Sequence, residues 1–251
     1  MPIKAVVSDW NGTLFKHATD EVQNKKLAYA VLSDAKKAVL RGRVWRLKDM
    51  VGLLKTKSEL QKRLQEYKED KRYLWEVYQP FNDGVLKGRP VAFIKGVIDE
   101  YAKESDTLVD RRILGPLRLA HMRGVSTAIL SVSYDYSIRR ILGEAGYAGL
   151  FDTIVANTLQ TEGSMAIGLT LGIYGLKKEV FYNEFLQKRG FQEDSTLYFG
   201  DTEDDEPIAS MLSPGNFIVP FFAIDEFKQR MAAKHQARVL ENEEDMQLIL
   251  Q

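Results

Sequence analysis

The sequence DWNGTL at residues 9–14 decides the fold, together with IKAVVS at residues 3–8, which precedes it. The earlier run is mostly apolar and β-branched, which is typical of a buried strand. We therefore expect Asp9 at the carboxyl end of that strand and Gly12 in the turn that follows. In an open parallel sheet, ligands bind at this edge. The carboxylate of Asp9 is thus the first candidate for a functional group.

The composition limits the class of protein. The chain has 251 residues, 45% of them apolar, and contains no cysteine, so disulfides and thiolate metal sites are excluded. Its formal charge is zero, which favours neither a nucleic-acid partner nor a membrane surface. No apolar run approaches membrane-spanning length, and a strand starting at Ile3 leaves no room for a signal peptide. We expect a soluble, cytoplasmic protein.

Charge is unevenly distributed along the chain. Residues 36–72 carry thirteen Lys or Arg against five Asp or Glu, whereas residues 193–251 carry four against thirteen. Two solvated helical surfaces would explain this pattern. A basic face that meets an anionic ligand, or the acidic part of the chain, would explain it as well.

The order of the expected elements indicates the architecture. Residues 19–104 have the spacing of successive amphipathic helices, interrupted near Pro80 and residues 82–84 and again at residues 88–90. After them, strands alternate with helices. Strands are expected at 125–130, 151–155, 196–199 and 216–219, helices at 114–122, 136–145 and 177–188, and a hairpin or loop at 157–175. This alternation predicts an α/β fold, a Rossmann-like doubly wound parallel sheet. An inserted all-helical cap domain at 16–104 would interrupt a core of 1–15 and 105–251.

Three expected strands end in polar residues, namely Asp9, Ser131 and Asp201. Their carboxyl ends should lie side by side. Asp9 and Asp201 would supply the hard oxygen ligands that suit magnesium, and the acidic run continues to Asp205. A lysine that opens the helix expected at 177–188 would suit a bound anion, because helix N-termini attract phosphate. Each residue alone has an ordinary explanation as a turn, capping or surface residue.

Taken together and in this order, the motifs resemble those of the haloacid dehalogenase-like (HAD) superfamily, and most closely its phosphoserine-phosphatase-like members. Residues 9–14 resemble the family's Asp-x-Asp-Gly-Thr-Leu motif, and Leu130-Ser131 resembles its second motif. Lys177 resembles the third-motif lysine, and it matches the family's spacing better than Lys178 does. Residues 200–205 resemble the Gly-Asp-x-x-x-Asp motif. The inserted helices lie where the family places a helical, C1-type cap.

The resemblance implies a chemistry. Asp9 would attack phosphorus and form an aspartyl-phosphate. Magnesium would be held by Asp9, the backbone carbonyl of Asn11 and Asp201, with Asp205 bound directly or through water. The phosphate-binding residues would be Thr13, Ser131 and Lys177. Asp205 is preferred to Asp204 as the last acidic residue of the fourth motif.

Asn11 departs from the family pattern, which places a second aspartate there as the general acid and base. An amide cannot exchange a proton in this way, and losing a general acid or base typically costs about 10² to 10⁴ in rate. Asn11 would keep its metal role through its backbone carbonyl. Another proton carrier, such as His17 or a cap residue, would make the chain a slow or specialised hydrolase. Otherwise the chain is a binding protein that kept the fold, or the asparagine is an inactivating substitution. Deamidation of Asn11 before Gly12 is a further, minor route to an aspartate.

The leading hypothesis is therefore a magnesium-dependent phosphatase that acts on a small phosphorylated compound. The alternative is a catalytically impaired HAD-like protein that binds a phosphorylated ligand or a protein partner. No nucleic acid and no membrane are expected as partners. A basic cap that binds nucleic acid would require steeply salt-dependent binding. The basic residues considered for substrate contact are Arg41, Arg43, Arg46 and Lys48.

Overall fold

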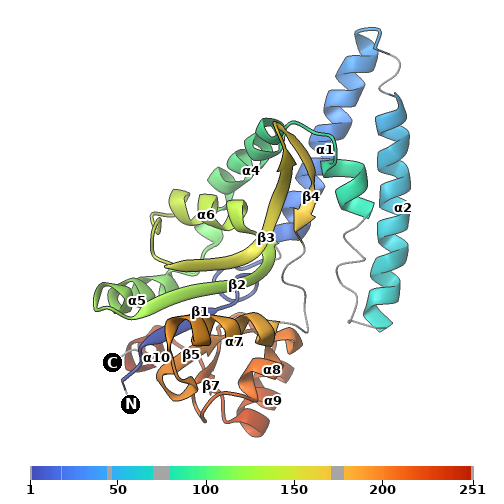
Figure 1. The fold of residues 1–251 in the computed structure, drawn as a ribbon. Coiled ribbons are helices and arrows are strands. Elements are labelled where there is room, and N and C mark those ends of the chain that lie inside the picture. Colours follow the sequence, from blue (N-terminus) through green and yellow to red (C-terminus); the bar gives the residue numbers. More distant parts are fainter. Residues whose placement is uncertain (1, 18, 44–46, 70–79, 171–177, 250–251) are drawn as a thin grey trace.

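The computed structural model describes residues 2–17, 19–43, 47–69, 80–170 and 178–249. Seven strands form one sheet in the order β4-β3-β2-β1-β5-β6-β7 (Figure 1). All neighbouring strands are parallel except β3 and β4. The strands are β1 (Ala5–Ser8), β2 (Ser126–Tyr134), β3 (Thr153–Glu162), β4 (Met165–Thr170), β5 (Thr196–Phe199), β6 (Phe217–Val219) and β7 (Arg238–Val239). The predicted α/β architecture is confirmed.

The helices fall into an inserted group and a group that covers the sheet. The inserted group comprises α1 (Thr19–Leu40), α2 (Leu47–Glu69), the π-helix η3 (Asn82–Leu86) and α4 (Val91–Ser105). The others are η4 (Asp106–Leu108), α5 (Arg111–Met122), α6 (Asp135–Glu144), α7 (Lys178–Arg189), η6 (Glu193–Ser195), η7 (Glu203–Asp205), α8 (Glu206–Ala209), α9 (Asp225–His235) and α10 (Glu243–Ile249). Within the described ranges, no helix combines the length and apolar character needed to cross a membrane.

The alternation of buried side chains along β1 explains the two layers of helices. Val6 points into a core shared with α5, α6 and α10. Ala5 and Val7 point into the opposite core, which is shared with α7, α8 and α9. All four residues of β1 are buried, as expected for the central strand of a sheet that is covered on both faces.

A third core lies among the inserted helices and includes part of the sheet. Leu27 of α1, Leu86 of η3 and Ile94 of α4 pack with Tyr134 of β2 and Leu169 of β4. The β3–β4 hairpin, which was expected as a hairpin or loop, rises from the sheet beside these helices (Figure 1). The inserted helices therefore share a hydrophobic core with this hairpin.

Candidate active site

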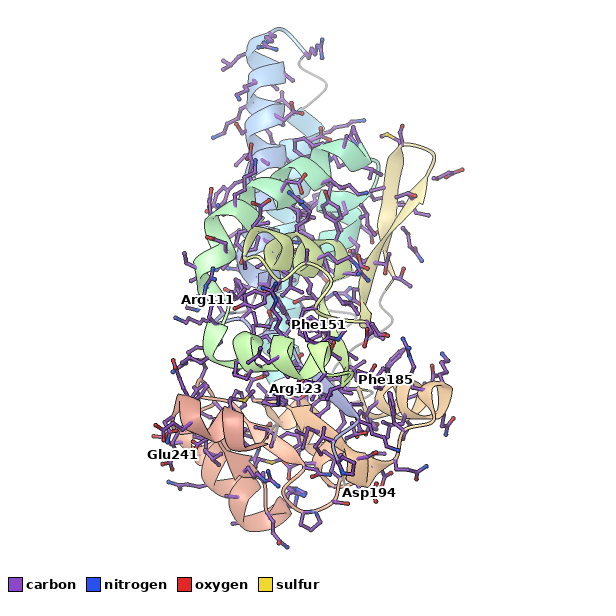
Figure 2. All side chains as sticks on the ribbon, turned by 90° about the vertical axis from the view of Figure 1, so that its left-hand side faces the viewer. Arg111, Arg123, Phe151, Phe185, Asp194 and Glu241 are labelled. Carbon is purple, nitrogen blue, oxygen red and sulfur yellow. The ribbon has the colours of Figure 1, made fainter. Side chains whose placement is uncertain are left out.

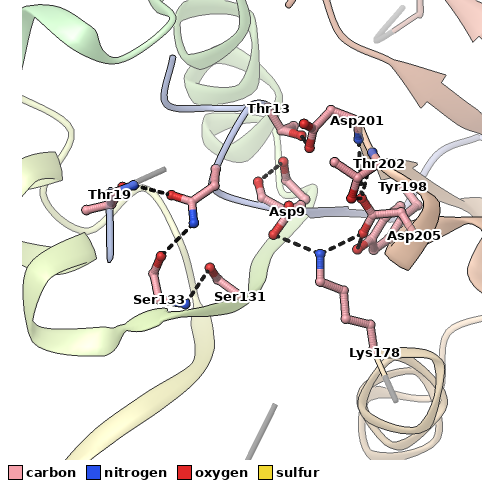
Figure 3. Close-up of polar contacts among 12 residues, drawn as sticks. Asp9, Thr13, Thr19, Ser131, Ser133, Lys178, Tyr198, Asp201, Thr202 and Asp205 are labelled. Carbon is pink, nitrogen blue, oxygen red and sulfur yellow. Dashed lines mark hydrogen bonds and ion pairs between the residues drawn. The ribbon is translucent and has the colours of Figure 1, made fainter. Parts of the chain in front are cut away.

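The register of the central strands brings the predicted residues to one edge of the sheet. Ser8 is paired with Ile129 of β2 and with Phe199 of β5. The next residue, Asp9, donates its backbone N–H to the carbonyl of Phe199 at 2.8 Å. Ser131 lies two residues beyond Ile129, within β2, and Asp201 lies two residues beyond Phe199, just after β5. The side chains of Asp9, Ser131 and Asp201 therefore lie near one another at one edge of the sheet (Figure 3). The expected parallel neighbours are confirmed, because β1 pairs with both β2 and β5. The prediction that the second strand ends at Ser131 is wrong, because β2 continues through Ser131 to Tyr134.

Three carboxylates gather at this edge. Oxygen atoms of Asp9, Asp201 and Asp205 all lie within 4.8 Å of one another. Asp9 and Asp205 are buried, and Asp201 is partly buried. Gly12 makes the approach of Asp201 possible, because a Cβ at position 12 would lie 2.0 Å from Asp201 Oδ2. Gly12 also has a φ of +71°, which favours glycine.

Lys178, the first residue of α7, lies between two of these carboxylates. Its Nζ is 3.1 Å from Asp9 Oδ1 and 2.8 Å from Asp205 Oδ1 (Figure 3). A cation at a helix N-terminus is disfavoured by the helix dipole, and the two carboxylates offset this cost. We predicted Lys177 for this position. Lys177 lies outside the described residues, and the structure places Lys178 in the site. Motif spacing alone does not distinguish two adjacent lysines.

The cluster contains more acidic groups than basic groups, and burial together with this imbalance shifts their pKa values. Burial raises the pKa of Asp9 to about 7, because the attraction of Lys178 only partly offsets it and repulsion by Asp205 adds to it. Burial and the neighbouring charges of Asp9 and Asp205 raise the pKa of Asp201 to about 8. Burial lowers the pKa of Lys178, but the attraction of Asp205 and Asp9 outweighs it, so the pKa is raised overall. Three carboxylates therefore face one ammonium group.

An oxygen-ligated divalent cation fits this arrangement. The donor set of Asp9 and Asp201 is made only of carboxylate oxygens, which is the ligand type that magnesium prefers. The side-chain-free turn at Gly12 leaves room for Asp201 beside it. A divalent cation would also offset the burial and the mutual repulsion that raise the pKa values of Asp9 and Asp201. The chemistry of the residues present thus agrees with the predicted metal.

Asp205 itself is fully engaged by protein donors. Its Oδ1 accepts hydrogen bonds from Lys178 Nζ at 2.8 Å and from the hydroxyl of Tyr198 at 2.7 Å. Its Oδ2 accepts from the backbone N–H of Asp201 at 3.2 Å and of Thr202 at 3.4 Å. A carboxylate has about four acceptor positions. Because these positions are occupied, the geometry favours an orienting role for Asp205 over direct coordination of a metal ion. The contact with Lys178 also agrees with the choice of Asp205 over Asp204.

The predicted phosphate-binding residues have different surroundings. Thr13 is buried, and its hydroxyl donates to Asp201 Oδ1 at 3.0 Å, which directs it to the carboxylate side of the site. Ser131 is also buried, and its Oγ accepts a hydrogen bond from the backbone N–H of Ser133 at 3.1 Å. The hydroxyl hydrogen of Ser131 has no acceptor among the described residues, so it remains a donor for an anion.

Asn11 links the core to the inserted helices. Its Oδ1 accepts from the backbone N–H of Thr19 at 2.9 Å, at the start of α1, and its Nδ2 donates to Ser133 Oγ at 2.9 Å. Trp10 Nε1 donates to Thr19 Oγ1 at 2.7 Å. Sequence reasoning missed Ser133 and Tyr198. The alternation of side chains along β5 could have indicated that Tyr198 faces α7.

The basic residues proposed for substrate contact lie elsewhere. Arg41 and Arg43 are exposed and follow α1, whose carboxyl end lies far from the sheet (Figure 1). Lys48 is exposed at the start of α2, and Arg46 lies outside the described residues. The interpretation of these residues as a solvated helical face agrees better with this placement. Figure 2 draws the side chains of the part of the chain that the structure describes.

Comparison with known proteins relates this geometry to a fold. No family model matches the sequence, and no curated protein is similar to it in sequence. A HAD family hydrolase from Salmonella enterica serovar Typhi aligns with a TM-score of 0.60 at 16% identity, over 96% of this chain and 68% of that protein. This chain has the HAD fold. An aspartyl-phosphate intermediate analogue of phosphoserine phosphatase aligns with a TM-score of 0.55 at 17% identity, over 96% and 95% of the two chains.

A third neighbour of this HAD-like chain is cytosolic 5′-nucleotidase IIIB bound to cytidine. It aligns with a TM-score of 0.64 at 16% identity, over 98% of this chain and 83% of that protein. The neighbours confirm the predicted HAD fold of the phosphoserine-phosphatase type. At these identities they establish the fold alone, so the activity has to be argued from the site.

Proposed function

We propose that this chain is a magnesium-dependent phosphohydrolase that acts on a small phosphorylated compound through an aspartyl-phosphate. The contact of Lys178 with Asp9 at 3.1 Å carries the proposal. It places a fixed cation beside a buried carboxylate at the ligand-binding edge of the sheet. The names of the structural neighbours, which include phosphatases, support the same reaction class.

In the proposed reaction, an Asp9 carboxylate oxygen attacks the phosphorus atom of the substrate. A bond forms between that oxygen and phosphorus, and the bond from phosphorus to the leaving oxygen breaks, with its electron pair going to the leaving group. Lys178 would neutralise a phosphoryl oxygen, and the hydroxyl of Ser131 would donate to another. Water then cleaves the acyl-phosphate, which releases phosphate and restores Asp9.

Magnesium would be held by Asp9, the backbone carbonyl of Asn11 and Asp201. It would shield Asp9 from the anionic substrate and stabilise the charge that develops on the phosphoryl group. Asp205 would act by orientation or through water, because protein donors already occupy its oxygens. Thr13 would fix Asp201 through the hydrogen bond of 3.0 Å between them, and turn amides would supply the remaining anion contacts.

Asn11 makes the proposed hydrolase slow. Its amide can donate a hydrogen bond but cannot transfer a proton to a leaving oxygen, and it cannot activate water as a base. Both ends of the amide are held by Thr19 and Ser133. We therefore infer a substrate whose leaving group departs without a proton donor, such as an acyl or aryl phosphate. The segment 16–104 would act as the helical cap over a core of 1–15 and 105–251.

The same contacts of Asn11 favour a second candidate, a catalytically impaired protein that binds a phosphorylated ligand. In that case Asn11 serves to fasten α1 to the core, and the site retains phosphate and metal without turnover. The two candidates differ in the fate of a bound phosphoryl group.

The test is an assay with 4-nitrophenyl phosphate, with and without magnesium, on the parent chain, Asn11→Asp and Asp9→Asn. The hydrolase proposal expects slow, magnesium-dependent release from the parent chain and none from Asp9→Asn. Activity that appears only in Asn11→Asp supports the impaired candidate. If no variant releases product, and Asp9→Asn leaves the binding of vanadate unchanged, both candidates fail.

A further inference from the structure

Tyr198 lies in the middle of β5 with its side chain on the face covered by α7. It is fully buried. Its ring stacks on Phe217 with centroids 5.7 Å apart and meets Tyr182 edge to face, also at 5.7 Å. The hydroxyl donates to Asp205 Oδ1 at 2.7 Å (Figure 3). A tightly packed ring therefore holds a single hydrogen-bond donor against the acidic cluster.

The position of that donor matters because Asp205 joins two parts of the site. One oxygen of Asp205 holds the ammonium of Lys178, and the other holds the backbone N–H of Asp201 and of Thr202. Thr202 and Asp205 also form a reciprocal capping box over this turn. Rotation of the Asp205 carboxylate would move the lysine and the turn that presents Asp201 together.

We propose that Tyr198 is a positioning residue that sets the affinity of the site for magnesium. Its hydroxyl fills the second acceptor position on Asp205 Oδ1 and so fixes the carboxylate in the orientation that Lys178 and the Asp201 turn require. This inference rests on the proposed metal-dependent function. Outer-shell partners of metal ligands typically contribute about 10-fold to 100-fold to metal affinity. Without the hydroxyl, one buried acceptor position on Asp205 is left unfilled, and the carboxylate can turn toward Lys178.

Tyr198→Phe removes the hydroxyl and keeps the ring. Tyr182→Phe is a matched control on the adjacent ring, because the hydroxyl of Tyr182 is buried and has no hydrogen-bond partner among the described residues. Each variant loses one buried hydroxyl oxygen, but only Tyr198→Phe loses a contact with Asp205. Calorimetric titration with magnesium chloride alone measures the affinity, and thermal unfolding in EDTA confirms that each variant is folded.

We expect Tyr198→Phe to bind magnesium about 10-fold to 100-fold more weakly than the parent chain, and Tyr182→Phe to bind it like the parent. Placing 4-aminophenylalanine at position 198 returns a donor and should restore most of the affinity, which a purely structural role would not predict. It also serves if Tyr198→Phe does not fold. Folded Tyr198→Phe with parental affinity overturns the inference while leaving the proposed function standing. The inference is also overturned if the variant with 4-aminophenylalanine at position 198 binds magnesium no better than folded Tyr198→Phe. If Tyr198→Phe does not fold, a weaker magnesium affinity of the 4-aminophenylalanine variant than of the parent chain overturns it instead. A parent chain that binds no magnesium overturns both.

Discussion

The side-chain nitrogen of Asn11 donates a hydrogen bond to Ser133 Oγ across 2.9 Å. The orientation of the amide follows from its other contact, because the backbone N–H of Thr19 needs an acceptor and meets the oxygen at 2.9 Å. Asn11 thereby joins the carboxyl end of β2 to the first turn of α1. A residue in the position of a proton carrier acts here as a link between the core and the inserted helices.

Asn11→Asp should accelerate the hydrolysis of an aryl phosphate. The aspartate can protonate the leaving oxygen and then activate water, and a general acid or base contributes about 10² to 10⁴ in rate. Ser133 can reverse its hydrogen bond and donate to the new carboxylate, so the link to β2 persists. Steady-state kinetics with magnesium measure the gain. Asn11→Ser, which introduces no titratable group, is the control. An equal gain in both variants would contradict the assigned role.

Lys178→Met should lose activity and stability, whereas Lys177→Met should not. Removing the ammonium leaves Asp9 and Asp205 without their shared cation, and breaking a buried ion pair typically costs about 3–5 kcal/mol. We expect the rate to fall by about 10² or more, because the charge on the phosphoryl group loses a fixed donor. Chemical unfolding in EDTA and the phosphatase assay measure the two effects. The reverse pattern, with Lys177 essential, would restore the prediction made from motif spacing.

Gly12→Ala should abolish magnesium binding. The added Cβ would lie 2.0 Å from Asp201 Oδ2, so the carboxylate has to leave its position. Gly42→Ala separates this effect from backbone strain. Gly42 has a similar φ of +81°, and nothing lies within 4 Å of its added Cβ. The control should lose only about 1 kcal/mol of stability and bind magnesium normally. Equal affinity in the two variants would rule out a close approach of Asp201 to residue 12.

The stability of the metal-free protein should fall as the pH rises from about 4 to about 8. Burial raises the pKa of Asp9 to about 7 and of Asp201 to about 8, above the ordinary value of 3.8. The folded protein therefore binds more protons than the unfolded chain in this window, and unfolding becomes easier as those protons are lost. Magnesium competes for the same oxygens, so it should stabilise the protein more at about pH 8 than at about pH 5.5.

Thermal unfolding in EDTA and in magnesium, at both ends of that range, measures the pH dependence. Asp201→Asn removes one of the two carboxylates and should flatten the metal-free profile. A metal-free stability that rises across the window would show that these carboxylates are ionised in the folded state and would contradict the assigned electrostatics.

The elements of the core could be predicted from local patterns. The expected strand at 196–199 coincides with β5, Thr196–Phe199, and the expected helix at 136–145 matches α6, Asp135–Glu144, within one residue. Short apolar runs followed by glycine or by polar residues indicate where these elements begin and end. The glycines at 157–175 indicated a hairpin or loop, but β3 extends to Glu162, well beyond the expected strand at 151–155.

Contacts between distant segments could not be predicted in the same way. Leu169 of the hairpin and Leu27 of α1 belong to one hydrophobic core, which depends on how β3 leaves the sheet. The bond from Tyr198 to Asp205 requires the face of β5 to be known. Lys177 and Lys178 are adjacent in sequence, and motif spacing alone does not distinguish them. Asn11 was identified as the departure from the family motif, but its partners Thr19 and Ser133 could not be inferred from one sequence.

The most direct test of the central claim is to trap the phosphorylated protein. If Asp9 is the nucleophile and Asn11 cannot activate water, the aspartyl-phosphate should accumulate in the parent chain. Parent chain and Asp9→Asn are mixed with magnesium and acetyl phosphate, quenched in acid and analysed by peptide mass spectrometry. We predict that one phosphoryl group is found on Asp9 of the parent chain and none at this position in Asp9→Asn. An unmodified Asp9 in a parent chain that still releases phosphate from the substrate would contradict the account.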